Sequence, residues 1–110
     1  MIEIDTGTEN ECYLISVKGE VDASSSIELD NALERALNES KKILIDLSQL
    51  EYISSAGLGV FISYLEELKG KKISLVLFGL KPKVREVFNI LGLQHLIKIV
   101  GTKAEGLDAV

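Results

Sequence analysis

The sequence predicts a single α/β domain, with a mixed, mostly parallel sheet and helices packed against it. Apolar strand-like segments alternate with segments of helical spacing along the 110 residues, a length that suits one domain. Two strand-like segments come first, with no helix between them. The expected order is therefore ββαβαβαβα, in which right-handed crossovers make the sheet parallel after the first pair of strands.

The first two strands are expected to form an antiparallel hairpin. Ile2 and Ile4 alternate with acidic residues, residues 6–10 have turn composition, and residues 12–18 alternate again. The link between the two segments is too short for a crossover, which leaves antiparallel pairing.

The first helix is expected to run from Ser25 to about Glu39. Ser25 and Glu28 have the spacing of a capping box, in which the serine and glutamate side chains satisfy free backbone N–H groups. The apolar residues after them recur at helical spacing: Ile27, Leu29, Ala32, Leu33, Ala36 and Leu37. The near-continuous apolar run at residues 43–47 then predicts a parallel strand covered on both faces.

A second helix is expected to start near Ser54 and Ser55 and to end at Gly70. Its buried stripe is predicted to consist of Leu58, Phe61, Ile62, Leu65 and Leu68. The apolar alternation at residues 73–78 predicts the next strand.

The last part of the chain is predicted to add a helix, a strand and a short terminal helix. Pro82 suits the first turn of a helix, and Gly92 suits its end. The apolar stripe of that helix would be Val84, Val87, Phe88 and Leu91. Residues 96–100 are expected to be a strand, and Thr102 with Glu105 forms a capping box for the terminal helix.

Composition and charge disfavour several functional classes. Hydrophobic residues make up 46% of the chain and charged residues 26%, which is ordinary globular composition. The net charge is −5 and there is no basic stripe, so we expect no direct binding of nucleic acid. Lys69, Lys71 and Lys72 are interpreted as a solvated helix end.

The sequence also suggests a cytoplasmic protein that does not bind membranes. Residues 1–5 alternate like a strand and lack the pattern of a targeting segment. No apolar run approaches the ~20 residues of a membrane span. Cys12 is the only cysteine, which excludes an internal disulfide and suits a reducing compartment.

We expect no catalytic residue, metal or cofactor. Cys12 and His95 are the only cysteine and histidine, too few soft ligands for zinc, and no phosphate-binding loop of the Walker type is present. Asp46 and Glu51 are interpreted as solvated charges. A small enzyme with a pocket lined by both Cys12 and His95 is the alternative that these residues leave open.

The most informative stretch is residues 46–60, where an apolar strand is followed by a loop and an apolar helix. Ser54, Ser55, Ala56 and Gly57 open that helix. A serine in this position is commonly an N-cap, because its hydroxyl accepts a hydrogen bond from a free N–H group. Taken alone, the serines need no further explanation.

The whole stretch nevertheless resembles the signature of STAS domains, as found in bacterial anti-sigma factor antagonists. A second similarity is the run Gly19-Glu20-Val21-Asp22 after the second strand. The resemblance covers essentially the full chain. The matching residues in the longer stretch are Asp46, Leu47, Ser48, Leu50, Tyr52, Ile53, Ser55, Gly57, Leu58 and Gly59.

This resemblance implies a partner-switching mechanism. In such proteins the serine matching Ser55 is phosphorylated by an anti-sigma factor that is also a serine kinase. The unphosphorylated antagonist binds that kinase and frees the sigma factor, and a PP2C-type phosphatase resets the system. Where the family usually has aspartate, this chain has Ser54, which leaves open which serine is modified. It also leaves open an alternative, a STAS scaffold subunit of a regulatory or transport complex that is never phosphorylated.

A phosphate at a helix start would be compatible with the fold, because the helix N-terminus carries partial positive charge. A partner covering the same surface would be repelled by the added charge. The expected partner-binding residues are Asp22, Ser54, Ala56, Gly57 and Gly59. For the two glycines, close packing of the helix on the sheet is an equal explanation.

Three cations follow the strand at residues 73–78, namely Lys81, Lys83 and Arg85. They could meet a phosphate on Ser55, but an exposed helix face is the favoured interpretation of all three. Asp22 is expected near Ser55, because loops after successive parallel strands emerge at the same edge of a sheet.

Overall fold

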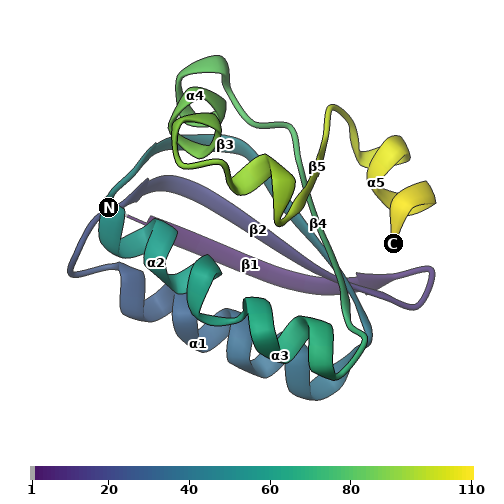
Figure 1. Ribbon diagram of the computed structural model, residues 1–110. Coiled ribbons are helices and arrows are strands. Elements are labelled where there is room, and N and C mark those ends of the chain that lie inside the picture. Colours follow the sequence, from purple (N-terminus) through teal and green to yellow (C-terminus); the bar gives the residue numbers. More distant parts are fainter. Residues whose placement is uncertain (1) are drawn as a thin grey trace.

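The structure is a computed structural model and describes residues 2–110. Its strands lie in the order β1-β2-β3-β4-β5, with β1 antiparallel to β2 and all other pairs parallel (Figure 1). The predicted α/β fold is thus confirmed. The elements are β1 Ile2–Glu9, β2 Cys12–Val21, α1 Ser26–Glu39, β3 Lys42–Ile53, α2 Ser55–Ser63, α3 Leu65–Gly70, β4 Ser74–Phe78, α4 Pro82–Ile90, the 3₁₀ turn η1 Leu93–His95, β5 Lys98–Val100 and α5 Lys103–Ala109.

The sheet separates two apolar clusters of unequal size. The larger one joins the sheet to α1, α2, α3, α4 and η1, and it contains Leu33, Phe61 and Phe88. The smaller one, on the opposite face, consists of Leu44, Val76 and Phe78 and is covered by residues of α5. None of the helices formed by residues 2–110 is long and apolar enough to cross a membrane.

Two strands are longer than the sequence predicted. The predicted turn at residues 6–10 is wrong, because β1 continues to Glu9 and only Asn10 and Glu11 turn, both with positive φ. The strand predicted at residues 43–47 extends to Ile53, where a loop was expected. After shifts in register, this extension pairs with the end of β2, so that Val21 lies opposite Ile53.

The helix boundaries also differ from the prediction. The capping box of Ser25 and Glu28 is wrong, since Ser25 makes no side-chain cap on α1. The predicted second helix is divided at Tyr64 into α2 and α3. The capping box of Thr102 and Glu105 on α5 is confirmed, and β5 is shorter than the predicted strand at residues 96–100.

Four apolar residues assigned to elements from their spacing lie at the surface instead. Ile27 is 64% exposed and Leu96 is 62% exposed. The same correction applies to Ile62 and Leu91, which are also exposed. These side chains are available for contacts with other molecules.

Candidate functional site

Ser54 and Ser55 have different roles at the start of α2. Ser54 is the N-cap, and its hydroxyl accepts a hydrogen bond from the Gly57 N–H at 3.3 Å. Ser55 is the first residue of the helix and is exposed. Its hydroxyl makes no hydrogen bond with any residue from 2 to 110. The cap is therefore satisfied without Ser55, whose hydroxyl faces solvent at the positive end of the helix.

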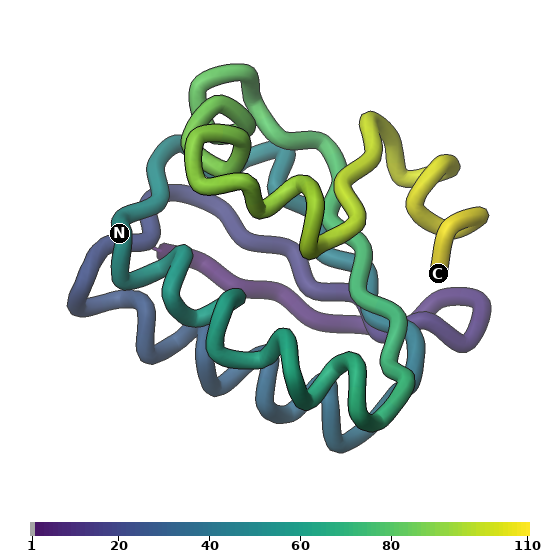
Figure 2. The backbone as a smooth tube through the Cα atoms, viewed as in Figure 1, coloured from purple at the N-terminus to yellow at the C-terminus, as the bar shows by residue number. Residues whose placement is uncertain are grey.

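The loop after β2 lies against this helix start. The Ser54 N–H donates to the Val21 carbonyl at 2.8 Å, one residue before Asp22. Figure 2 shows the two connections side by side, one leading into α1 and the other into α2. Both follow the carboxyl ends of neighbouring parallel strands, the edge of a sheet at which functional sites usually form.

Asp22 organises its own loop. Its Oδ1 atom accepts hydrogen bonds from the backbone N–H and the hydroxyl of both Ser24 and Ser25, at 2.8 to 3.0 Å. These bonds lower the pKa of Asp22 from 3.8 to about 2, because they stabilise the charged carboxylate. The bond from the Ser25 N–H has the largest effect. Ser25 is thus engaged by Asp22, and this explains why it does not form the predicted capping box with Glu28.

Gly57 and Gly59 differ in their surroundings. Gly57 is buried, and a Cβ atom there would lie 2.7 Å from side-chain atoms of both Val21 and Ile53. Gly59 is exposed, and a Cβ atom there would meet nothing within 4 Å. For Gly57, the structure favours close packing of α2 on the sheet over direct contact with a partner. Of the two glycines, only Gly59 lies at the surface, where a partner could contact it.

A shallow groove of about 250 Å³ lies between α1 and α2, next to Ser55. Ile27 is exposed and lines this groove from the first turn of α1.

Tyr64 and Asp30 join the two helices, since the Tyr64 hydroxyl donates to Asp30 Oδ1 at 2.6 Å. Burial is the main cause that raises the pKa of Tyr64, and the hydrogen bond to Asp30 is the second. The phenol therefore stays protonated and can donate this bond. The groove is lined by Ser26, Ile27, Asp30, Ala56, Gly59, Val60 and Ser63.

Comparison with known proteins assigns this arrangement to a family. The model of the STAS domain matches residues 3–106. The chain belongs to the STAS domain family. It is 37% identical over 92 residues to an anti-sigma-B factor antagonist of Listeria monocytogenes, covering 83% of this chain and 81% of that protein.

Two further relatives match nearly the whole chain, one in sequence and one in structure. An anti-sigma-B factor antagonist of Staphylococcus aureus is 29% identical over 106 residues, covering 94% of this chain and 98% of its own. The crystal structure of an anti-sigma factor antagonist from Mycobacterium paratuberculosis superposes with a TM-score of 0.91 at 25% identity, covering 100% of this chain and 94% of that one. Anti-sigma factor antagonists are regulatory proteins and have no enzymatic activity, which agrees with the expectation from the sequence.

Two of the three cations that follow β4 in this STAS domain are paired with a carboxylate. Lys81 donates a hydrogen bond to Glu51 Oε1, and Lys83 Nζ lies 3.6 Å from Glu51 Oε2. The bond from Lys81, more than the charge of Lys83, lowers the pKa of Glu51. These two lysines therefore already have a partner in the unmodified chain. Arg85 is exposed and has no ion pair among residues 2–110.

Cys12 and His95 lie in different environments of the STAS domain. Cys12 is buried in β2. His95 is exposed in η1 and lines a groove to which Cys12 does not contribute. Asp46 accepts a hydrogen bond from the Ser48 N–H at 2.9 Å, so it serves the local backbone.

Ile27 and Asp30 are site residues that the sequence did not indicate. Its helical spacing groups Ile27 with the other apolar residues of α1, although it lies only two residues after the N-cap Ser25. An apolar residue in a first turn can equally face outward over the next element. The sequence carries no signal that separates these two orientations, because the groove depends on how α1 and α2 pack against each other.

Proposed function

We propose that this STAS domain is an anti-sigma factor antagonist that acts by partner switching. The unphosphorylated chain binds an anti-sigma factor that is also a serine kinase, and thereby frees a sigma factor. Phosphorylation of Ser55 ends this association, and a PP2C-type phosphatase restores it. The family of the named relatives supports the class of protein, and the exposed hydroxyl of Ser55 supports the switch.

The observation that carries the proposal is the division of roles between the two serines. Ser54 uses its hydroxyl for the helix cap, while Ser55 leaves its hydroxyl without an internal partner. A kinase can therefore reach Ser55 without unfolding the helix start. Because the N-terminus of α2 offers free N–H groups and partial positive charge, the phosphate is tolerated by the domain itself.

The proposed partner surface surrounds Ser55. It comprises Asp22, Ser54, Ala56 and Gly59, together with Ile27 at the groove between α1 and α2. Buried Gly57 supports this surface from below. A phosphate of charge about −1.5 to −2 in its centre would have to lose its hydration on docking, which weakens the complex. The switch acts through the interface, and the fold stays the same.

The proposal is tested by incubating the purified chain with the anti-sigma factor kinase of the same genome and ATP. We expect a single phosphate, which peptide mass spectrometry locates on Ser55 and which is absent from Ser55→Ala. Ser54→Asp is the matched control, because aspartate also caps helices and is the residue the family usually has there. This variant is expected to be phosphorylated on Ser55.

A chain that binds partners but stays unmodified would contradict the switch. It would support the alternative, a scaffold subunit of a regulatory or transport complex, which Ser54 in place of aspartate keeps open. Phosphate on Ser54 with none on Ser55 would equally contradict the proposed roles of the two hydroxyls.

A further inference from the structure

Helices α1 and α2 are held in place at both ends of the groove that lies beside Ser55. At the Ser55 end, each helix start is bonded to the end of β2. The Ser54 N–H donates to the Val21 carbonyl at 2.8 Å, and the Ser26 N–H donates to the Asp22 carbonyl at 2.9 Å. Because both bonds belong to the backbone, they fix the two helix starts independently of the side chains there.

At the other end of the groove, one pair of side chains connects the helices. The Tyr64 hydroxyl donates to Asp30 Oδ1 at 2.6 Å and also reaches the Asp30 carbonyl oxygen at 3.2 Å. Among residues 2–110, these are the only hydrogen bonds between α1 and the segment from α2 to α3. Both side chains are partly buried, where a hydrogen bond to a carboxylate is stronger than at an open surface.

The helical backbone is interrupted at the residue that makes this connection. Tyr64 ends α2 and precedes α3, with φ −98° and ψ −4°. An unbroken helix would offer the Val60 carbonyl to the Tyr64 N–H, but the Ser63 hydroxyl donates to that carbonyl at 2.7 Å. The Tyr64 N–H bonds to the Phe61 carbonyl at 3.2 Å instead. Serine bonds of this kind bend helices, so α3 alone does not fix the direction of α2.

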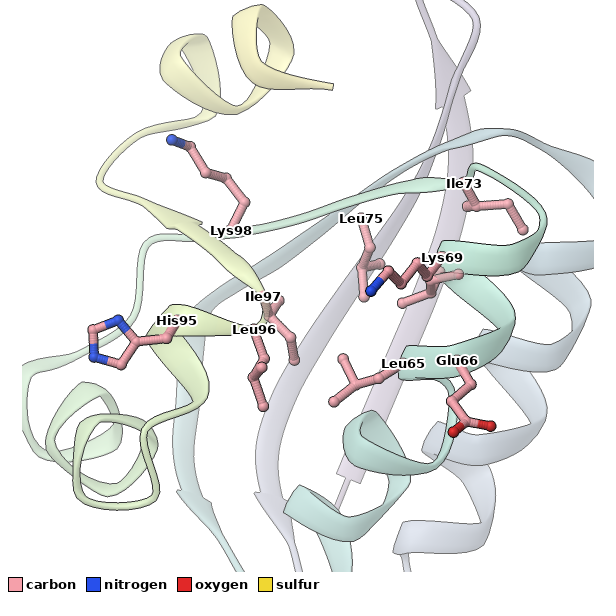
Figure 3. A pocket seen from close by; sticks show the side chains of 10 residues that line it. Leu65, Glu66, Lys69, Ile73, Leu75, His95, Leu96, Ile97 and Lys98 are labelled. Carbon is pink, nitrogen blue, oxygen red and sulfur yellow. The ribbon is translucent and has the colours of Figure 1, made fainter.

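The residue after Tyr64 anchors α3 on a different side. Leu65 points from the start of α3 toward Leu96, across a pocket of about 500 Å³ between α3 and the segment from η1 to β5 (Figure 3). Leu65 also packs against the main core. The start of α3 is therefore held by apolar contacts, while the bond to Asp30 is the polar contact that sets how closely the end of α2 approaches α1.

We propose that Tyr64 is a positioning residue of the partner surface. Its bond to Asp30 sets the spacing of α1 and α2. This spacing holds Ile27 and Gly59, on the two walls of the groove, in the arrangement that the anti-sigma factor kinase covers. Tyr64 acts through these residues and does not have to contact the kinase. The inference rests on the proposed function and deepens it, because it names the contact that shapes the surface around Ser55.

The first measurement needs no partner. Residual dipolar couplings of the backbone amides report the angle between α1 and α2 in the free chain. Tyr64→Phe removes a single hydroxyl and should change this angle and shift the amide resonances of Ile27 and Gly59. Tyr13→Phe is the matched control, because the Tyr13 hydroxyl on β2 makes no hydrogen bond among residues 2–110. The control should leave the angle and both resonances unchanged.

The second measurement is the affinity of the unphosphorylated variants for the anti-sigma factor kinase of the same genome. Tyr64→Phe and Asp30→Ala should each weaken binding about tenfold, the effect of losing one hydrogen bond to a charged group. The double variant should bind within about twofold of either single variant, because both changes remove the same bond. Asp30→Asn keeps an oxygen acceptor for the Tyr64 hydroxyl and should bind within about twofold of the parent, as should Tyr13→Phe.

An unchanged helix angle in Tyr64→Phe would overturn the proposal. Equal losses of affinity in Asp30→Asn and Asp30→Ala would also overturn it, because the kinase would then contact the Asp30 charge directly. A parent chain that binds the kinase no more tightly than Tyr64→Phe does would refute the positioning role alone. A parent chain that does not bind the kinase at all would refute the proposed function, and the positioning role with it.

Discussion

The Ser54 hydroxyl caps α2 by accepting the Gly57 N–H at 3.3 Å, while the hydroxyl of its neighbour Ser55 has no internal partner. One serine therefore maintains the helix start and the other is available for chemistry. This separation lets stability and modification be tested by different substitutions at adjacent positions.

Removal of the cap should reduce stability without removing the phosphate acceptor. Ser54→Ala is expected to lower the free energy of unfolding by about 1 kcal/mol, since the Gly57 N–H loses its acceptor. Ser55→Ala should change it by less than about 0.5 kcal/mol, as an exposed substitution. Urea denaturation of the two variants measures the difference. Equal losses would contradict the assignment of the cap to Ser54.

The two glycines of α2 should respond oppositely to alanine. Gly57→Ala places a Cβ atom 2.7 Å from Val21 and Ile53 side-chain atoms, which should destabilise the domain by about 1–3 kcal/mol. Gly59→Ala meets nothing within 4 Å and should stabilise the helix by about 0.5–1 kcal/mol. Thermal and urea denaturation report both. Tolerance of alanine at Gly57 would show that α2 does not pack on the sheet this closely.

Asp22 should contribute to the acid sensitivity of the fold. Its pKa is lowered from 3.8 to about 2 by hydrogen bonds to its charged form. Its stabilising effect is therefore complete above its unfolded-state pKa and is lost as the pH falls through about 4 to about 2. Between these values, Asp22→Asn should show a flatter loss of stability with pH than the parent chain. Carboxyl resonances followed by NMR give the pKa directly, and an ordinary value for Asp22 would contradict the bonded loop.

Ile27 should act in partner binding while contributing little to the fold. Ile27→Glu is expected to weaken binding to the anti-sigma factor kinase at least about tenfold, because an apolar anchor is replaced by a charge. Its stability should stay close to that of the parent, since the side chain is exposed. Ile90→Glu is the matched control, as Ile90 is also largely exposed but lies on α4. A similar loss in both variants would show that the effect is not local.

The element order and the parallel sheet could be predicted because apolar spacing differs between strands and helices. The extension of β3 to Ile53 could not, since it depends on pairing with β2 after register shifts. The capping box predicted for Ser25 and Glu28 failed for a similar reason. The Ser25 hydroxyl forms hydrogen bonds with Asp22 instead, and the sequence shows only the spacing of a capping box.

The site itself was only partly predictable. The position of Ser55 followed from its motif, whereas the burial of Gly57 and the pairing of Lys81 with Glu51 needed coordinates. Spacing also assigned Ile27 and Leu96 to regular elements without showing that both are exposed at grooves. Periodicity identifies which residues are apolar at regular intervals, but it does not show where neighbouring elements leave them uncovered.

The partner switch is tested most directly by the affinity of the chain for the anti-sigma factor kinase before and after stoichiometric phosphorylation of Ser55. Titration calorimetry should show a complex with the unmodified chain and an affinity at least about 100-fold lower for the phosphorylated one, a change of about 2.7 kcal/mol. Equal affinities of the two forms would contradict the account.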